Sequence, residues 1–135
     1  MSMLHVSDII AWLKTKFPGT EFYNGFIPKN SEQCVGVYLK QRGSRNLAIG
    51  GPACTSYATL PLSLLVHWTK DADSCEKEAD EIYSTMETAS GESAGGHRII
   101  DFNLIDPGPV DVSRDENNIC EMVIRVNVIY ERMTE

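Results

Sequence analysis

The side chains best suited to metal binding and catalysis are scattered along this chain. Its three histidines, His5, His67 and His97, lie in separate segments, so no histidine-based metal site is predicted. His67 stands beside Trp68 in an apolar stretch, and we expect it to be structural or to lie at an interface. Two acidic pairs carry the oxygen ligands that divalent cations accept: Asp71 with Asp73, and Asp115 with Glu116. Such pairs are common at helix caps and turns, which is the interpretation that we favour.

The cysteines offer a second kind of chemistry. Cys34, Cys54, Cys75 and Cys120 form no C-x-x-C pair and match no zinc pattern, so we expect free, buried thiols. Either of the first two could meet His67 in the folded chain and form a thiol nucleophile. No activating motif stands beside them, and the chain contains no G-x-G-x-x-G, phosphate-loop or G-x-S-x-G sequence. The pattern therefore favours binding or assembly over catalysis and predicts no cofactor.

Length and composition indicate one folded domain over residues 1–135. A chain of 135 residues with 42% hydrophobic and 23% charged residues is typical of a globular protein with its own core. No apolar run approaches the ~18–20 residues of a membrane span, and the first residues lack the features of a secretory signal. The net charge of −7 argues against a general nucleic-acid or anionic-membrane binder. We expect neither a membrane nor a sequence-specific nucleic acid as a partner.

Charge is distributed unevenly along the chain. Residues 29–45 contain one acid, Glu32, and four basic residues: Lys29, Lys40, Arg42 and Arg45. Between residues 71 and 92, Lys77 is the only base among eight acids: Asp71, Asp73, Glu76, Glu78, Asp80, Glu81, Glu87 and Glu92. Opposite patches suit head-to-tail self-association, in which the basic patch of one subunit meets the acidic patch of the next. Two separately solvated faces are the open alternative.

Hydrophobic periodicity and turn residues predict an α+β order of elements. Helices are expected over residues 8–16, with Ser7 as N-cap, and from an N-cap at Asp73 to a flexible link over residues 89–96. Strands are expected over residues 20–23, 34–40, 62–69, 98–105 and 110–113, and from Cys120 onward. In the strand over 98–105, Ile100, Phe102 and Leu104 should share a face. A glycine-rich flexible loop of about residues 41–60 separates two of the strands, and we interpret it as functional. A loop that contains a short strand around residues 46–49 is the open alternative.

The last strand has an unusual length and two different faces. Apolar residues occupy every second position, namely Cys120, Met122, Ile124, Val126, Val128 and Tyr130. The alternate face is mixed: Ile119, Glu121, Val123, Arg125, Asn127, Ile129 and Glu131. We expect the first face to be the core wall against the helices. We expect the mixed face to meet other subunits, and assembly more than folding to set the length of the strand.

Three stretches resemble a known family when they are read in order. They are FYNGFIPKNSEQCVGVYLKQRG, LSLLVHWTKDADSCEKEADEIYSTM and DPGPVDVSRDENNICEMVIRVNVIYER, which together cover roughly Phe22 to Arg132. This order resembles the tailed-phage minor capsid protein family, which is similar in size and layout to the tail terminator and tail-to-head joining proteins of long-tailed phages. One departure is that Asn117-Asn118 stands where the family's acidic turn has glycine. Asparagine tolerates positive φ better than most residues, so the turn can survive this change.

The resemblance implies a fold and a role. The fold would be a mixed, mostly antiparallel β-sheet with helices packed on one face. The role would be that of a phage or prophage virion protein without enzymatic activity, present in the bacterial cytoplasm during assembly. Its partners would be copies of itself in a sixfold ring, the major tail tube protein and the connector or completion protein of the head. The ring would cap the tail tube at the head–tail junction of a siphophage.

If this chain forms such a ring, the following residues are expected to lie between subunits. Lys40, Arg42 and Arg45 would face Glu78, Asp80 and Glu81 of the neighbouring subunit. The loop over residues 42–59 would point to the lumen or to the tube. Arg125 and Asn127 would contribute from the mixed face of the last strand.

Other functions remain open at the level of sequence. The chain could be a different minor capsid or head-completion protein of a phage. It could also be a small α+β enzyme or ligand-binding domain, with a pocket near His67 and Cys34. A third alternative is an adaptor that dimerises through the edges of its sheet.

Overall fold

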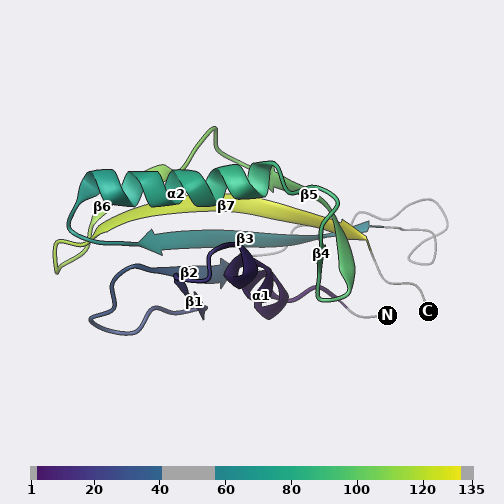
Figure 1. Ribbon diagram of the computed structural model, residues 1–135, viewed down its shortest axis with the longest axis horizontal. Helices are drawn as coiled ribbons and strands as arrows, with labels where there is room; N and C mark the ends of the chain where they lie inside the picture. Colours follow the sequence, from purple (N-terminus) through teal and green to yellow (C-terminus); the bar gives the residue numbers. More distant parts are fainter. Residues whose placement is uncertain (1–2, 41–56, 132–135) are drawn as a thin grey trace.

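The computed structural model describes residues 3–40 and 57–131, which form a layer of helices on a curled sheet (Figure 1). Its two helices are α1 (Val6–Lys16) and α2 (Ala72–Glu87). Its strands are β1 (Glu21–Asn24), β2 (Cys34–Leu39), β3 (Tyr57–His67), β4 (Ser93–Ala94), β5 (His97–Leu104), β6 (Val110–Arg114) and β7 (Cys120–Glu131). The predicted final strand, its neighbour over 110–113 and both helices are therefore present.

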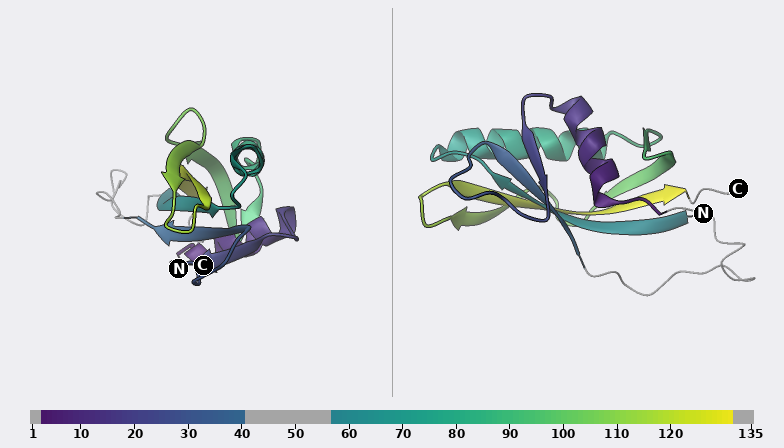
Figure 2. Two further views of the ribbon diagram at one scale, coloured as in Figure 1. Left: turned by 90° about the vertical axis from the view of Figure 1, so that its left-hand side faces the viewer. Right: turned by 90° about the horizontal axis from the view of Figure 1, so that it is seen from below.

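The strands form one sheet in the order β1-β2-β3-β7-β5-β4, and β6 also pairs with β7. β1 and β2 run parallel, whereas all other pairs are antiparallel. Both helices lie on the same side of the sheet (Figure 2, right). Trp12 of α1 stacks on Phe102 of β5, with a distance of 4.8 Å between the ring centroids. The Cys75 thiol of α2 donates a hydrogen bond to the Cys120 carbonyl of β7. The predicted α+β fold, with a mixed and mostly antiparallel sheet and helices on one face, is confirmed.

The core lies between this sheet face and the two helices. Ile124, Val126, Val128 and Tyr130 of β7 are at most 1% exposed, and Cys120 is buried with them. The residues between them are half-buried or exposed. The alternation predicted for the last strand is therefore confirmed: its even-numbered residues form the core wall.

The length of β7 has a cause within the domain. β3 pairs with β7 over eleven positions, from Tyr57 opposite Glu131 to His67 opposite Glu121. On the other edge of β7, β5 pairs with its second half and β6 with its first half. One long strand thus supports three partners within the domain, and the expectation that assembly sets its length stays a prediction.

Both helices begin earlier than predicted. The N-cap of α1 is His5, whose backbone N–H donates to the Asp8 carboxylate at 2.9 Å. The N-cap of α2 is Asp71, whose carboxylate accepts from the backbone N–H of Asp73 at 3.2 Å. Ser7 and Asp73 are therefore inside the helices. In α1, Asp8 lies inside the helix and accepts the N–H of the N-cap residue His5. In α2, Asp71 lies outside the helix and accepts the N–H of Asp73 in the first turn.

Three expectations about strands were wrong for local reasons. β3 begins at Tyr57 and not at 62, so residues 57–60 of the expected loop belong to the sheet; Pro61, a residue rare within strands, hid this extension. The expected link over 89–96 contains β4, which pairs with β5 through Gly95 and Gly96. A bulge in β5 buries Ile99 and leaves Ile100 38% exposed, because an extra residue reverses the alternation.

Candidate assembly surfaces

The face of the sheet away from the helices is partly apolar and mostly half-buried at its centre, whereas Ile27 packs over it at Gly36. Its central residues come from β3 and β7 and lie opposite each other across the two strands. The pairs are Thr59 with Ile129, Pro61 with Asn127, Ser63 with Arg125 and Leu65 with Val123. All of them are half-buried apart from Arg125, which is exposed. We call these eight residues the outer sheet face.

Arg125 is held in place on this face by its own chain. Its guanidinium donates twice to the Asp106 carboxylate, from Nε to Oδ2 at 2.9 Å and from Nη2 to Oδ1 at 2.7 Å. This two-point contact lowers the pKa of Asp106 and raises the pKa of Arg125. Asn127 lies between Pro61 of β3 and Asn103 of β5. Both predicted interface residues of β7 are therefore on the outer sheet face, in a fixed arrangement.

The predicted acidic patch lies on the opposite side of the molecule, on α2. Cys75, Ala79, Ile82 and Met86 turn one face of this helix into the core. Asp80 and Glu81 are exposed, whereas Glu78 is half-buried, and burial followed by the charge of Glu81 raises the pKa of Glu78. Among the described residues, the acids of α2 make one ion pair, Asp73 with Lys77 at 3.0 Å. Within the described part of the chain, most of the negative charge on α2 is therefore left uncompensated.

The predicted basic patch is placed only in part. Lys40 follows β2, is exposed, and donates its backbone N–H to the Pro61 carbonyl at 3.0 Å. Arg42, Arg45 and the loop over residues 41–56 lie outside the described residues. The pairing of these basic residues with the acids of a neighbouring α2 stays a prediction.

Sequence reasoning missed an open sheet edge at β6. All five residues of β6 are exposed, with Val110 at 44% and Val112 at 48%. Within the described part of the chain, β6 pairs with β7 alone, so its other edge has backbone N–H and C=O groups free to pair. Ile105, in the turn between β5 and β6, is 49% exposed. The two valines that alternate with polar residues were the available signal.

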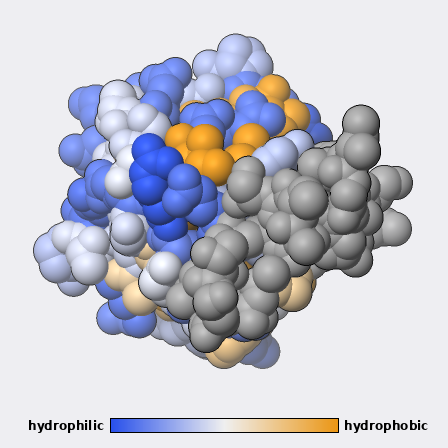
Figure 3. All heavy atoms as spheres, turned by 90° about the vertical axis from the view of Figure 1, so that its right-hand side faces the viewer, coloured by the Kyte–Doolittle hydropathy of each residue, from blue (hydrophilic) through white to orange (hydrophobic). Residues whose placement is uncertain are grey.

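Hydrophobic side chains are also exposed at the opposite end of the sheet, where β3 and β5 begin. Figure 3 views this end and shows hydrophobic side chains between hydrophilic ones. Tyr57 is 41% exposed, and Ile100 is turned outward by the bulge. Exposed apolar side chains therefore occur at both ends of the sheet.

The alternative of a thiol nucleophile meets an unfavourable environment. Cys34 lies directly opposite His67 across β2 and β3, as that alternative requires. However, burial, and then the charges of Glu21 and Glu121, raise the pKa of the Cys34 thiol to about 11. Nucleophilic cysteines need the opposite shift, because only the thiolate attacks. Cys34, Cys75 and Cys120 are free and buried, as predicted, and Cys54 lies outside the described residues.

Cys34 should therefore react slowly with alkylating agents in the folded protein. At pH 8, a pKa of about 11 leaves about one thiol in a thousand ionised, against about one in ten at the ordinary value of 9.0. Mass spectrometry after a short treatment with iodoacetamide should find Cys34 unmodified, and should find it fully alkylated when urea is present. Rapid alkylation of Cys34 without urea would restore the nucleophile as a candidate.

A domain with uncompensated charge, an open strand edge and exposed apolar side chains has the features of an assembly protein. Residues 3–132 match the family model described as bacteriophage tail terminator protein. The chain therefore belongs to the bacteriophage tail terminator protein family, and the predicted tail terminator resemblance is confirmed. No curated protein and no solved structure matches the chain.

Membership of this family implies a structural role in the phage tail, and hence a component of the virion. No helix in the described part of the chain is long and apolar enough to cross a membrane. The separate prediction of a minor capsid protein is not tested by these findings.

Proposed function

We propose that this chain forms a ring, with six subunits, that caps the finished tail tube and joins it to the connector of the phage head. The family match over residues 3–132 carries the proposal, because it spans both helices and every strand of the domain. A tail tube has an exposed end at which further tube subunits could add. A ring that binds this end stops growth and presents a new surface to the head.

The surfaces of the domain support a ring of this kind. A closed ring is made of head-to-tail contacts, so each subunit needs two different surfaces that fit each other. The acidic residues of α2 lie on the helix side of the sheet, whereas the β6 edge and the outer sheet face lie elsewhere on the subunit. If the acidic residues of α2 contact the neighbouring subunit, the β6 edge and the outer sheet face remain for the tube and for the connector.

Electron microscopy of the protein mixed with polymerised tubes of the cognate major tail tube protein tests the cap. We expect a ring at one end of each tube, and no further growth when tube subunits are added. A protein that binds only isolated connector, and leaves tube growth unchanged, would be a head-completion protein instead.

The charge contact between subunits makes a separate prediction. Replacing Asp80 and Glu81 with lysine should lower the fraction of rings in native mass spectrometry, because two attractive contacts become repulsive. Glu78 is left unchanged, since it is half-buried and its replacement would also disturb packing. The thermal midpoint of the monomer should remain close to that of the parent protein, because both residues are exposed.

A charge swap provides the matched control. Replacing Arg42 and Arg45 with glutamate should lower the fraction of rings by itself, and should restore it when combined with the two lysines on α2. Ring formation that does not change in either pair of variants would contradict charge pairing between subunits. Failure of the swap to restore rings would show that α2 and the basic segment meet different partners.

A further inference from the structure

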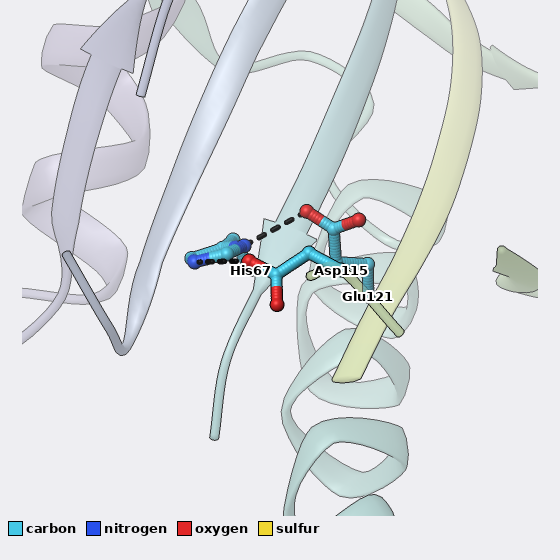
Figure 4. A group of neighbouring side chains, drawn as sticks. All are labelled: His67, Asp115 and Glu121. Atoms are coloured by element: carbon cyan, nitrogen blue, oxygen red, sulfur yellow. Dashed lines mark hydrogen bonds and ion pairs between the residues drawn. The ribbon is translucent and has the colours of Figure 1, made fainter. Parts of the chain in front are cut away.

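A histidine and two carboxylates lie together in a hollow at the end of β3, and we propose that the histidine and one carboxylate bind a divalent transition-metal ion of the zinc type while the other carboxylate orients the histidine. The three residues are His67, Asp115 and Glu121 (Figure 4). Their ligand atoms all lie within 4.8 Å of one another. They come from β3, from the turn between β6 and β7, and from β7, which are far apart in the sequence. The proposal does not depend on the ring, because it concerns a site within one subunit.

The position of each side chain is determined by the backbone around it. His67 and Glu121 face each other across the β3–β7 pair, with Nδ1 at 2.8 Å from Oε2. Asp115 uses its Oδ1 to accept the backbone N–H groups of Asn117 and Ile119, both at 2.9 Å. These two hydrogen bonds hold the turn and leave Oδ2 directed at His67, 3.7 Å from Nε2. The carboxylate is therefore oriented before any ion binds.

Each ring nitrogen of His67 faces a carboxylate, with Nδ1 at 2.8 Å from Glu121 Oε2 and Nε2 at 3.7 Å from Asp115 Oδ2. When the imidazole is neutral it has a single N–H, and donation of that N–H to Glu121 across 2.8 Å places it on Nδ1. Nε2 then presents a lone pair to the Asp115 carboxylate, which is also an acceptor. A cation between Nε2 and Oδ2 turns the repulsion of two acceptors into two coordinate bonds.

The geometry resembles that of known histidine–metal sites. A metal-bound histidine usually donates its other N–H to a carboxylate, which orients the ring and increases its basicity. Glu121 would take this orienting position, while His67 Nε2 and Asp115 Oδ2 would be the ligands. Ligands at about 2.1 Å from a tetrahedral ion lie roughly 3.4 Å apart, close to the observed 3.7 Å. Water would complete the coordination.

The hollow around the cluster has room for these waters and favours a cation. Its volume is about 470 Å³, and it opens to solvent. The charged residues that line it, besides His67, are Glu32, Asp115, Glu116 and Glu121 on the acidic side and Lys29 and Lys70 on the basic side. Carboxylates thus outnumber ammonium groups by four to two. The nitrogen ligand selects zinc, nickel or copper over magnesium and calcium, which are bound through oxygen.

Titration calorimetry with zinc chloride tests the site, using protein stripped with EDTA and kept reduced. We expect one zinc ion per subunit in the parent protein. Replacing Asp115 with asparagine should weaken binding at least tenfold, because an amide is a poorer metal ligand than a carboxylate. The turn itself should be preserved, because the remaining oxygen can still accept the backbone N–H groups of Asn117 and Ile119. His67→Gln should weaken it by a similar factor, whereas magnesium should not bind at this site in any variant.

His5→Gln is the matched control, because His5 also lies near a carboxylate but is exposed on the surface. Its Nδ1 is 3.8 Å from Asp8 Oδ2. Zinc should bind this variant as it binds the parent protein, and should raise the thermal midpoint of both. Binding that persists unchanged in Asp115→Asn and His67→Gln would place the ion elsewhere, for example on the cysteines, and would overturn the proposal. Absence of zinc binding by the folded parent protein would overturn it as well.

Discussion

Replacing Ile124 with alanine should lower the free energy of unfolding by about 2–5 kcal/mol, the usual range for truncating a fully buried Ile or Leu. Ile124 is 1% exposed and lies on the core face of β7, opposite Leu64 of β3. Removal of three carbon atoms there leaves a cavity between the sheet and the helices. Urea unfolding followed by tryptophan fluorescence measures the loss, since Trp12 is buried in the same core.

Ile129→Ala is the matched control for this experiment. It makes the same chemical change in the same strand, but Ile129 lies on the outer sheet face and is half-buried. We expect a loss of about 1 kcal/mol or less, because little apolar area leaves the core. Equal losses in the two variants would contradict the assignment of the two faces. A small loss of stability with a large loss of rings would identify Ile129 as a subunit contact.

Replacing Gly95 with alanine should lower the free energy of unfolding by about 2–4 kcal/mol, which combines backbone strain with a steric clash. Gly95 connects β4 to β5 and has a φ of +57°, in the left-handed region. A methyl group there would come within 2.7 Å of both carboxylate oxygens of Asp8. That carboxylate also accepts the N–H of His5 at the start of α1, so a shift of its position would disturb the helix end.

Gly91→Ala separates these two contributions. Gly91 has a φ of +87°, and a methyl group there would meet nothing within 4 Å. Only backbone strain remains, so we expect a loss of about 1 kcal/mol. Thermal unfolding of both variants gives the comparison. If Gly95→Ala loses no more than Gly91→Ala, the close approach of the hairpin to Asp8 does not contribute to stability.

Much of the fold could be predicted from local patterns. The alternation in β7 showed which of its faces would be buried, because residues on one side of a strand recur at every second position. The apolar spacing in α2 identified its buried face in the same way. The α+β class followed from the order of such segments, whereas the tail terminator family was reached through the resemblance of three longer stretches to that family.

Local patterns failed where the backbone departs from regular geometry. The bulge in β5 exchanged the roles of Ile99 and Ile100, and a bulge has no reliable signature in one sequence. β4 was missed because two residues are too short for periodicity, although Gly95 and Gly96 marked the turn. The surfaces proposed for assembly were even less accessible, since exposure depends on what the rest of the chain covers.

The sequence alone was sufficient to identify the class of fold, the buried faces of α2 and β7, and the phage tail family. The fold class and the buried faces follow from the order and spacing of apolar residues, which act over a few positions, whereas the family was identified by resemblance. The tertiary structure was needed to show that β7 serves three strands and that Gly95 touches Asp8. It was also needed to bring His67, Asp115 and Glu121 together. These contacts depend on the register between distant strands, and register is determined by the packing of the whole domain.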